Sequence, residues 1–216
     1  MGATDAAPAP VPRYLEYDGA SLPVDLKEAL RYAGVPAGAE ASDETLALAR
    51  RAEELAAGVS ACRVGYVDVP LAWEDGFAVL PFAQRSADLA KALAGCERAV
   101  IFAATIGTGF DRLIRRWERT DAALAVMLQG LGAERVEALC DAFCADVRKA
   151  AGERGYTARP RFSPGYGDLP LEVQPELLAL VDAPRRLGIT LSESLLMSPK
   201  KSVTAIIGLK KAEVNA

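Results

Sequence analysis

A long stretch with a helical repeat of apolar residues is the feature that most constrains how this chain folds. It begins at Thr120 or Asp121 and runs to about Ala151, and Gly130 and Gly132 interrupt it. The apolar positions that repeat are Leu124, Met127, Leu128, Leu131, Val136, Leu139, Cys140, Phe143 and Val147. This period predicts one long helix with a buried face. Because each glycine costs about 1 kcal/mol relative to Ala inside a helix, we expect the glycines either to kink it or to let another element approach closely.

The strand signals predict an antiparallel sheet. Ala99–Ala104 is a continuous apolar run of strand length, which is typical of a central strand. Two further pairs of segments look like hairpins: Ala61–Val69 with Phe77–Phe82 around the turn signal Glu74-Asp75-Gly76, and Ser192–Met197 with Val203–Leu209 around Ser198-Pro-Lys-Lys201. Because hairpins join antiparallel strands, the sequence favours a mixed α+β fold, a twisted antiparallel sheet flanked by helices, over a doubly wound parallel sheet.

The remaining segments complete the domain plan. Helices are expected over Asp25–Ala33, over Asp43–Ala57 with Ser42 as the cap, from the Ser86 cap to about Ala94, and over Gln174–Leu187. Residues 1–12 are rich in Ala and Pro and are expected to form a flexible leader, with a single domain over 13–216. The leader lacks the charged region and apolar core of a signal peptide, so a cytoplasmic location is expected.

Composition excludes several classes of function. The formal net charge is −4, so we expect neither a nucleic-acid partner nor an anionic membrane surface. The chain contains no histidine, which removes Ser–His and Cys–His nucleophile pairs and every His-ligated metal site. Its four cysteines, Cys62, Cys96, Cys140 and Cys144, form no CxxC pair and are interpreted as small buried hydrophobic residues. We expect no catalytic side chain and no metal.

Two short features allow both an ordinary and a functional interpretation. Thr105-Ile-Gly-Thr-Gly109 follows a strand and precedes a helix, but Arg112 occupies the third glycine position of a dinucleotide fingerprint, so a simple glycine turn is favoured. Glu137 lies at the edge of the buried face of the long helix, on the same line as Gly130. It is either a solvated glutamate or a carboxylate that receives a cationic group of a ligand.

Arg161-Phe-Ser-Pro-Gly-Tyr166 is the most informative segment. Pro164-Gly165 is a turn signal that fixes the spacing between a guanidinium and a phenol. Arg161 can hold a carboxylate through two parallel hydrogen bonds, Tyr166 can stack or donate a hydrogen bond, and the backbone of the turn is expected to be free for a heteroaromatic ring. The segment is therefore either a loop that binds a small molecule or an ordinary turn.

These residues also carry a family resemblance. Arg161-x-x-Pro-Gly-Tyr166, Leu187-Gly-Ile-Thr-Leu-Ser-Glu-Ser194, Met197-x-Pro199 and Ser202-Val203 resemble, in order and spacing, the activation domain of cobalamin-dependent methionine synthase. The resemblance covers about residues 130–209. It implies a mixed α+β module that binds S-adenosylmethionine and docks on a corrinoid domain when cob(II)alamin is reduced and remethylated.

The resemblance also implies roles for individual residues. Arg161 would hold the methionyl carboxylate, the backbone at Ser163 would contact the adenine, and Gly165 would belong to the same S-adenosylmethionine site. Tyr166 would lie at the mouth, facing the corrin, and Glu137 would be a secondary contact. The family's N-terminal aspartate, which grips the amino group of the ligand, has only Asp18 and Asp25 as candidates, and its C-terminal aromatic pair has no counterpart.

The function implied is that of a reactivation module in a split or multi-subunit methionine synthase. The cobalamin would be held by a corrinoid-binding methyltransferase subunit, and a flavodoxin-like or other donor would supply the electron. Alternatives are a regulatory protein that senses S-adenosylmethionine and a structural subunit of a corrinoid methyltransferase complex. Lys200 and Lys201 are expected to be exposed, either as a solvated turn or as a contact for one of these partners.

Overall fold

The computed structural model describes residues 10–36 and 38–212, so residues 1–9 of the predicted leader lie outside the described residues. Its centre is a five-stranded sheet, and every neighbouring pair of strands in it is antiparallel. In spatial order the strands are β1 (Arg13–Tyr17), β2 (Cys62–Pro70), β5 (Cys96–Thr105), β9 (Ser202–Lys211) and β6 (Tyr156–Ala158).

The central strand β5 is buried on both faces, which explains its continuous apolar sequence. Alternate side chains of a strand point to opposite faces of its sheet. The two sets are Val100, Phe102 and Ala104 in one hydrophobic cluster, and Ala99, Ile101 and Ala103 in the other. The predicted central strand is therefore confirmed.

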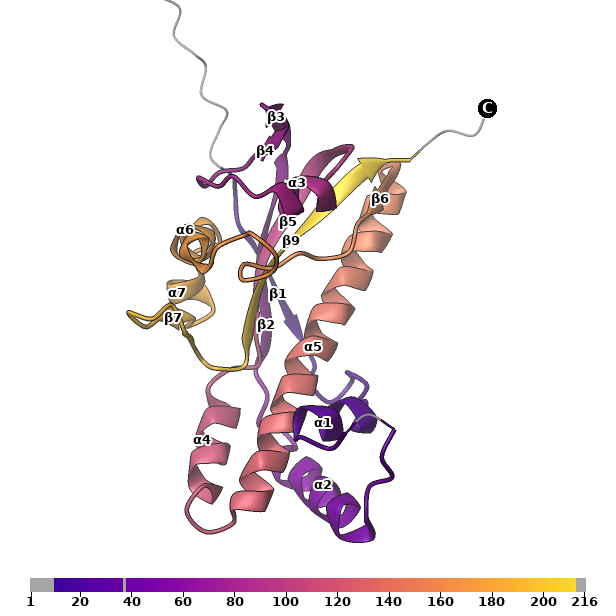
Figure 1. Ribbon diagram of the computed structural model, residues 1–216, viewed down its shortest axis with the longest axis vertical. Coiled ribbons are helices and arrows are strands. Elements are labelled where there is room, and N and C mark those ends of the chain that lie inside the picture. The colour runs from indigo at the N-terminus through magenta and orange to yellow at the C-terminus, as the bar shows by residue number, and fades with distance from the viewer. Residues whose placement is uncertain (1–9, 37, 213–216) are drawn as a thin grey trace, which may run out of the picture.

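Helices cover one face of the sheet, and shorter elements cover the other (Figure 1). The first face carries α1 (Leu26–Tyr32), α2 (Asp43–Ala56), α4 (Gly109–Trp117) and α5 (Ala122–Glu153). The second face carries α3 (Ala87–Ala92), the 3-10 turn η1 (Leu171–Val173), α6 (Gln174–Leu180) and α7 (Ala183–Arg186). Two small ribbons complete the fold: β3 (Ala72–Glu74) with β4 (Phe77–Val79), and β7 (Thr190–Leu191) with β8 (Met197–Ser198).

Side-chain caps fix the starts of the predicted N-terminal helices. The Asp25 carboxylate accepts from the Lys27 N–H at 2.9 Å, and the Ser42 hydroxyl accepts from the Thr45 N–H at 3.2 Å. Asp121 caps α5 in the same way. Such caps satisfy backbone donors that have no partner inside the helix. α5 is 32 residues long, yet no helix in the described part of the chain is long and apolar enough to cross a membrane.

Gly130 and Gly132 of α5 permit close approach, the second of the two expected outcomes. A Cβ at Gly130 would lie 2.4 Å from the carbonyl oxygen of Ala29, on α1. A Cβ at Gly132 would lie 2.9 Å from Cδ1 of Phe110, on α4. α5 is one helix throughout, so the glycines let α1 and α4 pack directly on its backbone.

The first predicted hairpin was wrong in its partners. The turn at Asp75-Gly76 closes only the ribbon of β3 and β4, whereas β2 pairs with β1 and β5. β1 carries no strong strand signal and was not predicted. β2 is nine residues long, so it needs a long neighbour to satisfy its backbone, and β5 provides that neighbour over eight paired positions.

The second predicted hairpin was also wrong. β9 pairs with β5 and β6, and the expected strand Ser192–Met197 is mostly a turn between β7 and β8. Lys200 is exposed as expected, but Lys201 is half-buried and its Nζ donates to the carbonyl of Gln129 at 2.9 Å. Burial lowers the pKa of the Lys201 ammonium.

Two further expectations concern the ends of helices. The single helix predicted over Gln174–Leu187 is broken into α6 and α7 at Asp182, whose φ of +46° is incompatible with a right-handed helix. The glycine turn before α4 is confirmed, since Gly107 has φ +78° and α4 starts at Gly109. A Cβ at Gly109 would lie 2.3 Å from the carbonyl oxygen of Val59, so packing against the chain accounts for this glycine.

Gly130→Ala tests the close packing of α1 on α5. Because the added methyl would overlap backbone atoms of α1, we expect the free energy of unfolding to fall by about 1–3 kcal/mol. Urea denaturation followed by circular dichroism measures the change. The control is Gly152→Ala in the same helix, where a Cβ meets no described atom within 4 Å, and there we expect a gain of up to about 1 kcal/mol. A Gly130→Ala protein as stable as the parent would contradict this account.

Candidate functional site

The segment that holds the predicted site runs beside the outer edge of β9. The Arg159 N–H donates to the carbonyl of Gly208 at 2.8 Å, and Phe162 exchanges two backbone hydrogen bonds of 2.8 Å with Ile206. Pro160 restricts the residue before it to extended conformations, which keeps the segment along the strand. The sheet therefore fixes the backbone on both sides of Arg161.

The Pro164-Gly165 turn is closed by its own hydrogen bonds. Gly165 has φ +89°, a conformation that favours glycine. The Tyr166 N–H donates to the carbonyl of Ser163 at 3.2 Å, and the Gly165 N–H donates to the carbonyl of Leu169 at 2.8 Å. The expectation that the backbone of this turn is free was therefore wrong for these groups.

A single carboxylate ties the end of this loop to helix α3. The Asp168 carboxylate accepts from the Ala87 N–H at 2.7 Å, from the Asp88 N–H at 3.1 Å and from the Ser86 hydroxyl. These hydrogen bonds lower the pKa of the Asp168 carboxyl, and the one from the Ser86 hydroxyl has the largest effect. The loop is thus fixed at Phe162 by β9 and at Asp168 by α3.

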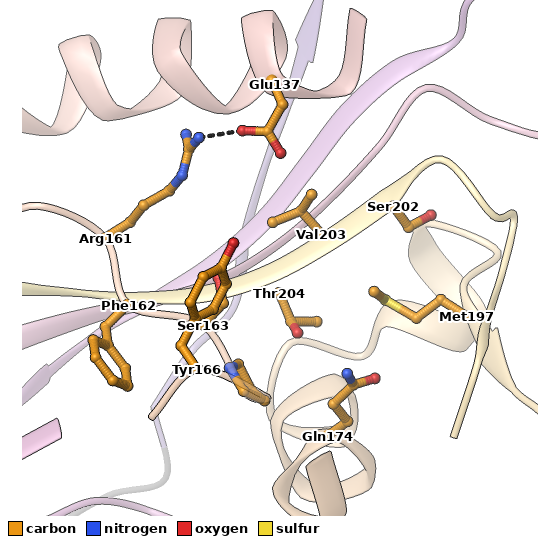
Figure 2. A pocket seen from close by; sticks show the side chains of 11 residues that line it. Glu137, Arg161, Phe162, Ser163, Tyr166, Gln174, Met197, Ser202, Val203 and Thr204 are labelled. Carbon is orange, nitrogen blue, oxygen red and sulfur yellow. Dashed lines mark hydrogen bonds and ion pairs between the residues drawn. The ribbon is translucent and has the colours of Figure 1, made fainter. Parts of the chain in front are cut away.

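Between these two anchors the loop borders a cavity of about 430 Å³ (Figure 2). This volume lies in the range of sites for small molecules. The lining residues are Glu137, Arg161, Phe162, Ser163, Pro164, Tyr166, Gln174, Met197, Ser202, Val203 and Thr204. Four of the five predicted site residues meet here; the fifth, Gly165, shapes the turn and is not among the described residues of the lining.

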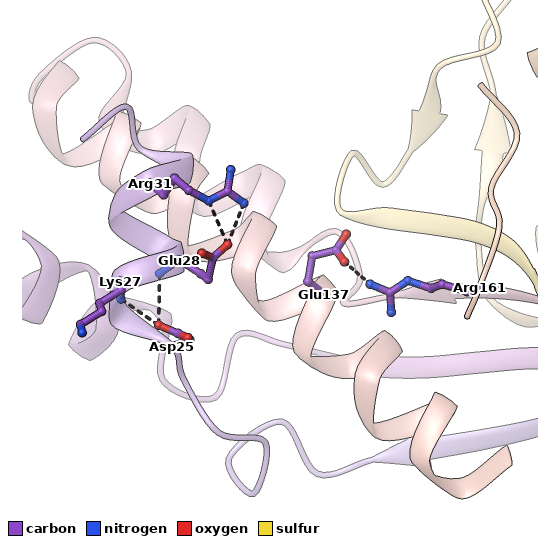
Figure 3. A network of polar contacts seen from close by, with 6 residues as sticks. All are labelled: Asp25, Lys27, Glu28, Arg31, Glu137 and Arg161. Carbon is purple, nitrogen blue, oxygen red and sulfur yellow. Dashed lines mark hydrogen bonds and ion pairs between the residues drawn. The ribbon is translucent and has the colours of Figure 1, made fainter. Parts of the chain in front are cut away.

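Charged groups from α5 meet Arg161 at one end of the cavity. One guanidinium nitrogen donates to Glu137 (Figures 2 and 3). The other donates to Asp141 at 2.8 Å. The side chains of Arg161 and Glu137 are 24% and 38% exposed, whereas that of Asp141 is 74% exposed. Glu137 therefore does receive a cationic group, and in this structure that group belongs to Arg161.

The cysteines near this ion pair are free thiols. Cys140 lies on α5 between Glu137 and Asp141 in the sequence and is buried. Cys144 lies one turn further along α5 and is half-buried. Burial raises the pKa of both thiols, which keeps them protonated near neutral pH. A protonated thiol is a poor nucleophile and a poor metal ligand.

The two candidates for the N-terminal aspartate lie elsewhere. Asp25 caps α1 through the N–H groups of Lys27 and Glu28 (Figure 3), and Asp18 accepts from the Ala20 N–H in a turn. Asp25 lines a separate, larger cavity of about 710 Å³, whose lining also includes Glu137. Glu137 therefore lies between the two cavities.

Sequence reasoning missed two polar residues of the lining, Gln174 and Thr204. Gln174 occupies the same helix face as the buried Leu177, Leu178 and Val181, a spacing of three, four and seven residues. A polar residue at an apolar position of a helix is the signal that could have identified it. Thr204 and Ser202 are two residues apart on β9, and both are buried polar residues just before the apolar run Ala205–Leu209.

Comparisons with known proteins agree on the family and the fold. The sequence model of the family described as vitamin B12 dependent methionine synthase, activation domain, matches residues 87–213. A search of curated proteins found no significant match. Among solved structures, the chain is similar to the crystal structure of the MetH reactivation domain bound to AdoHcy, with a TM-score of 0.73 and 16% identity, over 96% of this chain and 81% of that one. The predicted α+β fold, an antiparallel sheet flanked by helices, is thereby confirmed.

Asp168→Asn tests whether this carboxylate holds the site loop. The variant should have a lower melting temperature at pH 7, because it loses the charge that these hydrogen bonds favour. Since the folded pKa is lowered, the contribution is present above the ordinary carboxyl range and is lost as the pH falls through the lowered pKa. The difference in melting temperature between parent and variant should therefore shrink below about pH 4.

Differential scanning fluorimetry from pH 7 to acid measures both curves. The matched control is Glu172→Gln, which neutralises an exposed carboxylate four residues further along the chain and should leave the melting temperature unchanged. A difference between parent and Asp168→Asn that is absent, or that stays constant with pH, would show that Asp168 does not hold the loop.

Proposed function

Because the chain belongs to the family of activation domains of vitamin B12 dependent methionine synthase, we propose that it binds S-adenosylmethionine in the Arg161 cavity and supports remethylation of a corrinoid that a partner holds. The related domain of known structure was crystallised with AdoHcy, the product form of this ligand. The proposal rests on the charged side chains that surround Arg161 at one end of the cavity.

The charges at one end of the cavity are the observation that carries the proposal. In the lining, Arg161 brings one positive charge and Glu137 one negative charge. Asp141 pairs with Arg161 from the lining of the neighbouring cavity and brings a second negative charge. S-adenosylmethionine carries one carboxylate, one ammonium and one sulfonium. Its charges are thus the complement of those in the site, and a guanidinium can bind a carboxylate through two parallel hydrogen bonds.

Binding requires only a limited change in the existing ion pairs. A guanidinium has five N–H donors in a fixed plane, so Arg161 can keep its hydrogen bond to Glu137 while it binds a second carboxylate. Asp141 is the more exposed partner, and the loss of an exposed ion pair costs about 0–1 kcal/mol. The ligand carboxylate would replace Asp141, and the ligand ammonium would lie between the carboxylates of Glu137 and Asp141.

The rest of the loop would hold the nucleoside. Ser163 lines the cavity and would contact the adenine through its backbone, while Gly165 would fix the turn that presents it. Tyr166 lines the same cavity and is 68% exposed, so it lies at the mouth, where the corrin of a docked partner would approach.

The chemistry would come from the ligand and the partner. S-adenosylmethionine supplies a methyl group on a sulfonium, and transfer to a reduced corrinoid needs alignment and no general base. The chain would position this methyl group, a corrinoid-binding methyltransferase subunit would hold the cobalamin, and a flavodoxin-like or other donor would supply the electron.

One observation favours a second candidate function, a regulatory or structural subunit that keeps the fold without supporting turnover. Asp18 and Asp25 each use one carboxylate oxygen in a local hydrogen bond, and neither is among the described residues that line the Arg161 cavity, where it would have to grip the amino group of a ligand. The two functions differ in one assay. A reactivation module is required for methylcobalamin to form from a cob(II)alamin protein, S-adenosylmethionine and a reductant, whereas a regulatory subunit is not.

Arg161→Ala tests the proposed binding site. Loss of a charge-assisted hydrogen bond costs about 1.5–3 kcal/mol, so S-adenosylmethionine should bind roughly ten- to a hundredfold more weakly. Isothermal titration calorimetry measures the dissociation constants. The control is Arg159→Ala, since the Arg159 guanidinium donates to the carbonyl of Ala94 and the residue lies outside the cavity lining as described.

We expect the Arg159→Ala protein to bind S-adenosylmethionine as the parent does. Equal binding by the parent and Arg161→Ala would place the ligand elsewhere, and an intact protein that binds no S-adenosylmethionine would rule out the proposed function.

A further inference from the structure

Gln174 is a buried polar side chain that lacks a partner within the described chain. It is the first residue of α6 and is 5% exposed, and its Oε1 atom accepts no hydrogen bond from any described residue. Buried side-chain polar atoms are usually paired, because an unpaired one forfeits its hydrogen bond to water. The amide nevertheless lies in the lining of the Arg161 cavity.

The cavity has a charged end and an uncharged end, and Gln174 lies at the uncharged end. Figure 2 shows Gln174 and Met197 well away from the Arg161–Glu137 pair. Gln174, Met197 and Thr204 are all uncharged, so this part of the lining suits a neutral group. A ligand with an amino-acid end and a heterocyclic end would place its charges at Arg161 and its ring near Gln174.

An ordinary packing role does not account for this residue. Leu177, Leu178 and Val181 follow Gln174 on the same buried face, where an apolar side chain of similar size would avoid an unpaired acceptor. A structural glutamine would also be expected to hydrogen-bond to the chain around it. Its free acceptor therefore points to a partner that comes from outside the chain.

We propose that Gln174 recognises the amino-bearing edge of the adenine ring; this inference rests on the proposed function and specifies how the cavity selects its ligand. An amide offers an acceptor and two donors side by side. Oε1 would accept from the exocyclic amino group, and Nε2 would donate to the neighbouring ring nitrogen. Glutamine and asparagine pair with adenine in this way where proteins read bases.

The test compares S-adenosylmethionine with S-inosylmethionine, whose purine carries an oxo group in place of the amino group. The oxo group cannot donate to Oε1, so the parent protein should bind the inosine analogue at least about tenfold more weakly. Gln174→Met keeps the size of the side chain and removes both polar groups. This variant should bind the two ligands with dissociation constants within about twofold of each other.

The melting temperature of Gln174→Met separates recognition from a structural role. Because Oε1 has no partner among the described residues, its removal should leave the melting temperature unchanged or higher. The matched control is Glu176→Ala, an exposed position two residues further along α6, which should keep the parent's preference for adenine. The comparison of the two ligands on the parent protein needs no variant and holds even if Gln174→Met folds poorly.

Three outcomes would overturn the inference. A parent that binds both ligands equally well has no need of an adenine-reading residue. A Gln174→Met protein that keeps the full preference, or that binds both ligands more weakly by the same factor, would show that the amide does not read this edge, and the proposed function would still stand. A parent that binds neither ligand would instead refute the proposed function, and the inference with it.

Discussion

The outer edge of β9 determines where the cavity forms. β9 spans ten residues, but β6 pairs with it only from Leu209 to Lys211. Beyond β6, the Arg159–Gly208 hydrogen bond and the bridge between Phe162 and Ile206 attach the loop segment, and the first residues of β9 then border the cavity. An unpaired strand edge exposes backbone groups that need partners, so the Arg161–Tyr166 loop both covers this edge and leaves room beside it.

The two faces of the sheet bring different chemistry to that edge. α5 lies on one face and contributes the Glu137 carboxylate to the cavity, while α6 lies on the other and contributes the amide of Gln174. Glycines in α5 let α1 and α4 pack on its backbone, which fixes the position of this helix. The anchors at Phe162 and Asp168 then hold the loop against both. Core packing therefore sets the spacing between a charged end and a neutral end of one cavity.

The elements that the sequence predicted well are those with local signals. The period of apolar residues and the Asp121 cap defined α5, and the two-sided burial of β5 was visible as an apolar run. Strand partners were not predictable in the same way. A turn signal such as Asp75-Gly76 locates a reversal of the chain but does not say how long the strands on either side are, and β2 found its partners at β1 and β5 instead.

The site was predicted in part for the same physical reason. The motif of the loop identified Arg161, Ser163 and Tyr166, because their spacing is local. The pairing of Arg161 with Glu137 joins residues 24 positions apart and depends on how α5 packs, so it became visible only in the fold. Gln174 was overlooked as one polar residue in an apolar helix pattern, and its place in the lining of the cavity became visible only in the fold.

The most direct measurement of the central claim is a titration of the isotopically labelled chain with S-adenosylmethionine, followed by nuclear magnetic resonance. Binding in the Arg161 cavity should produce the largest shifts at the backbone amides of Ser163 and Tyr166, at the methyl group of Met197 and at the side-chain amide of Gln174, all in the lining of one cavity. Shifts confined to the separate cavity around Asp25 and Glu134, or no shifts at saturating ligand, would contradict it.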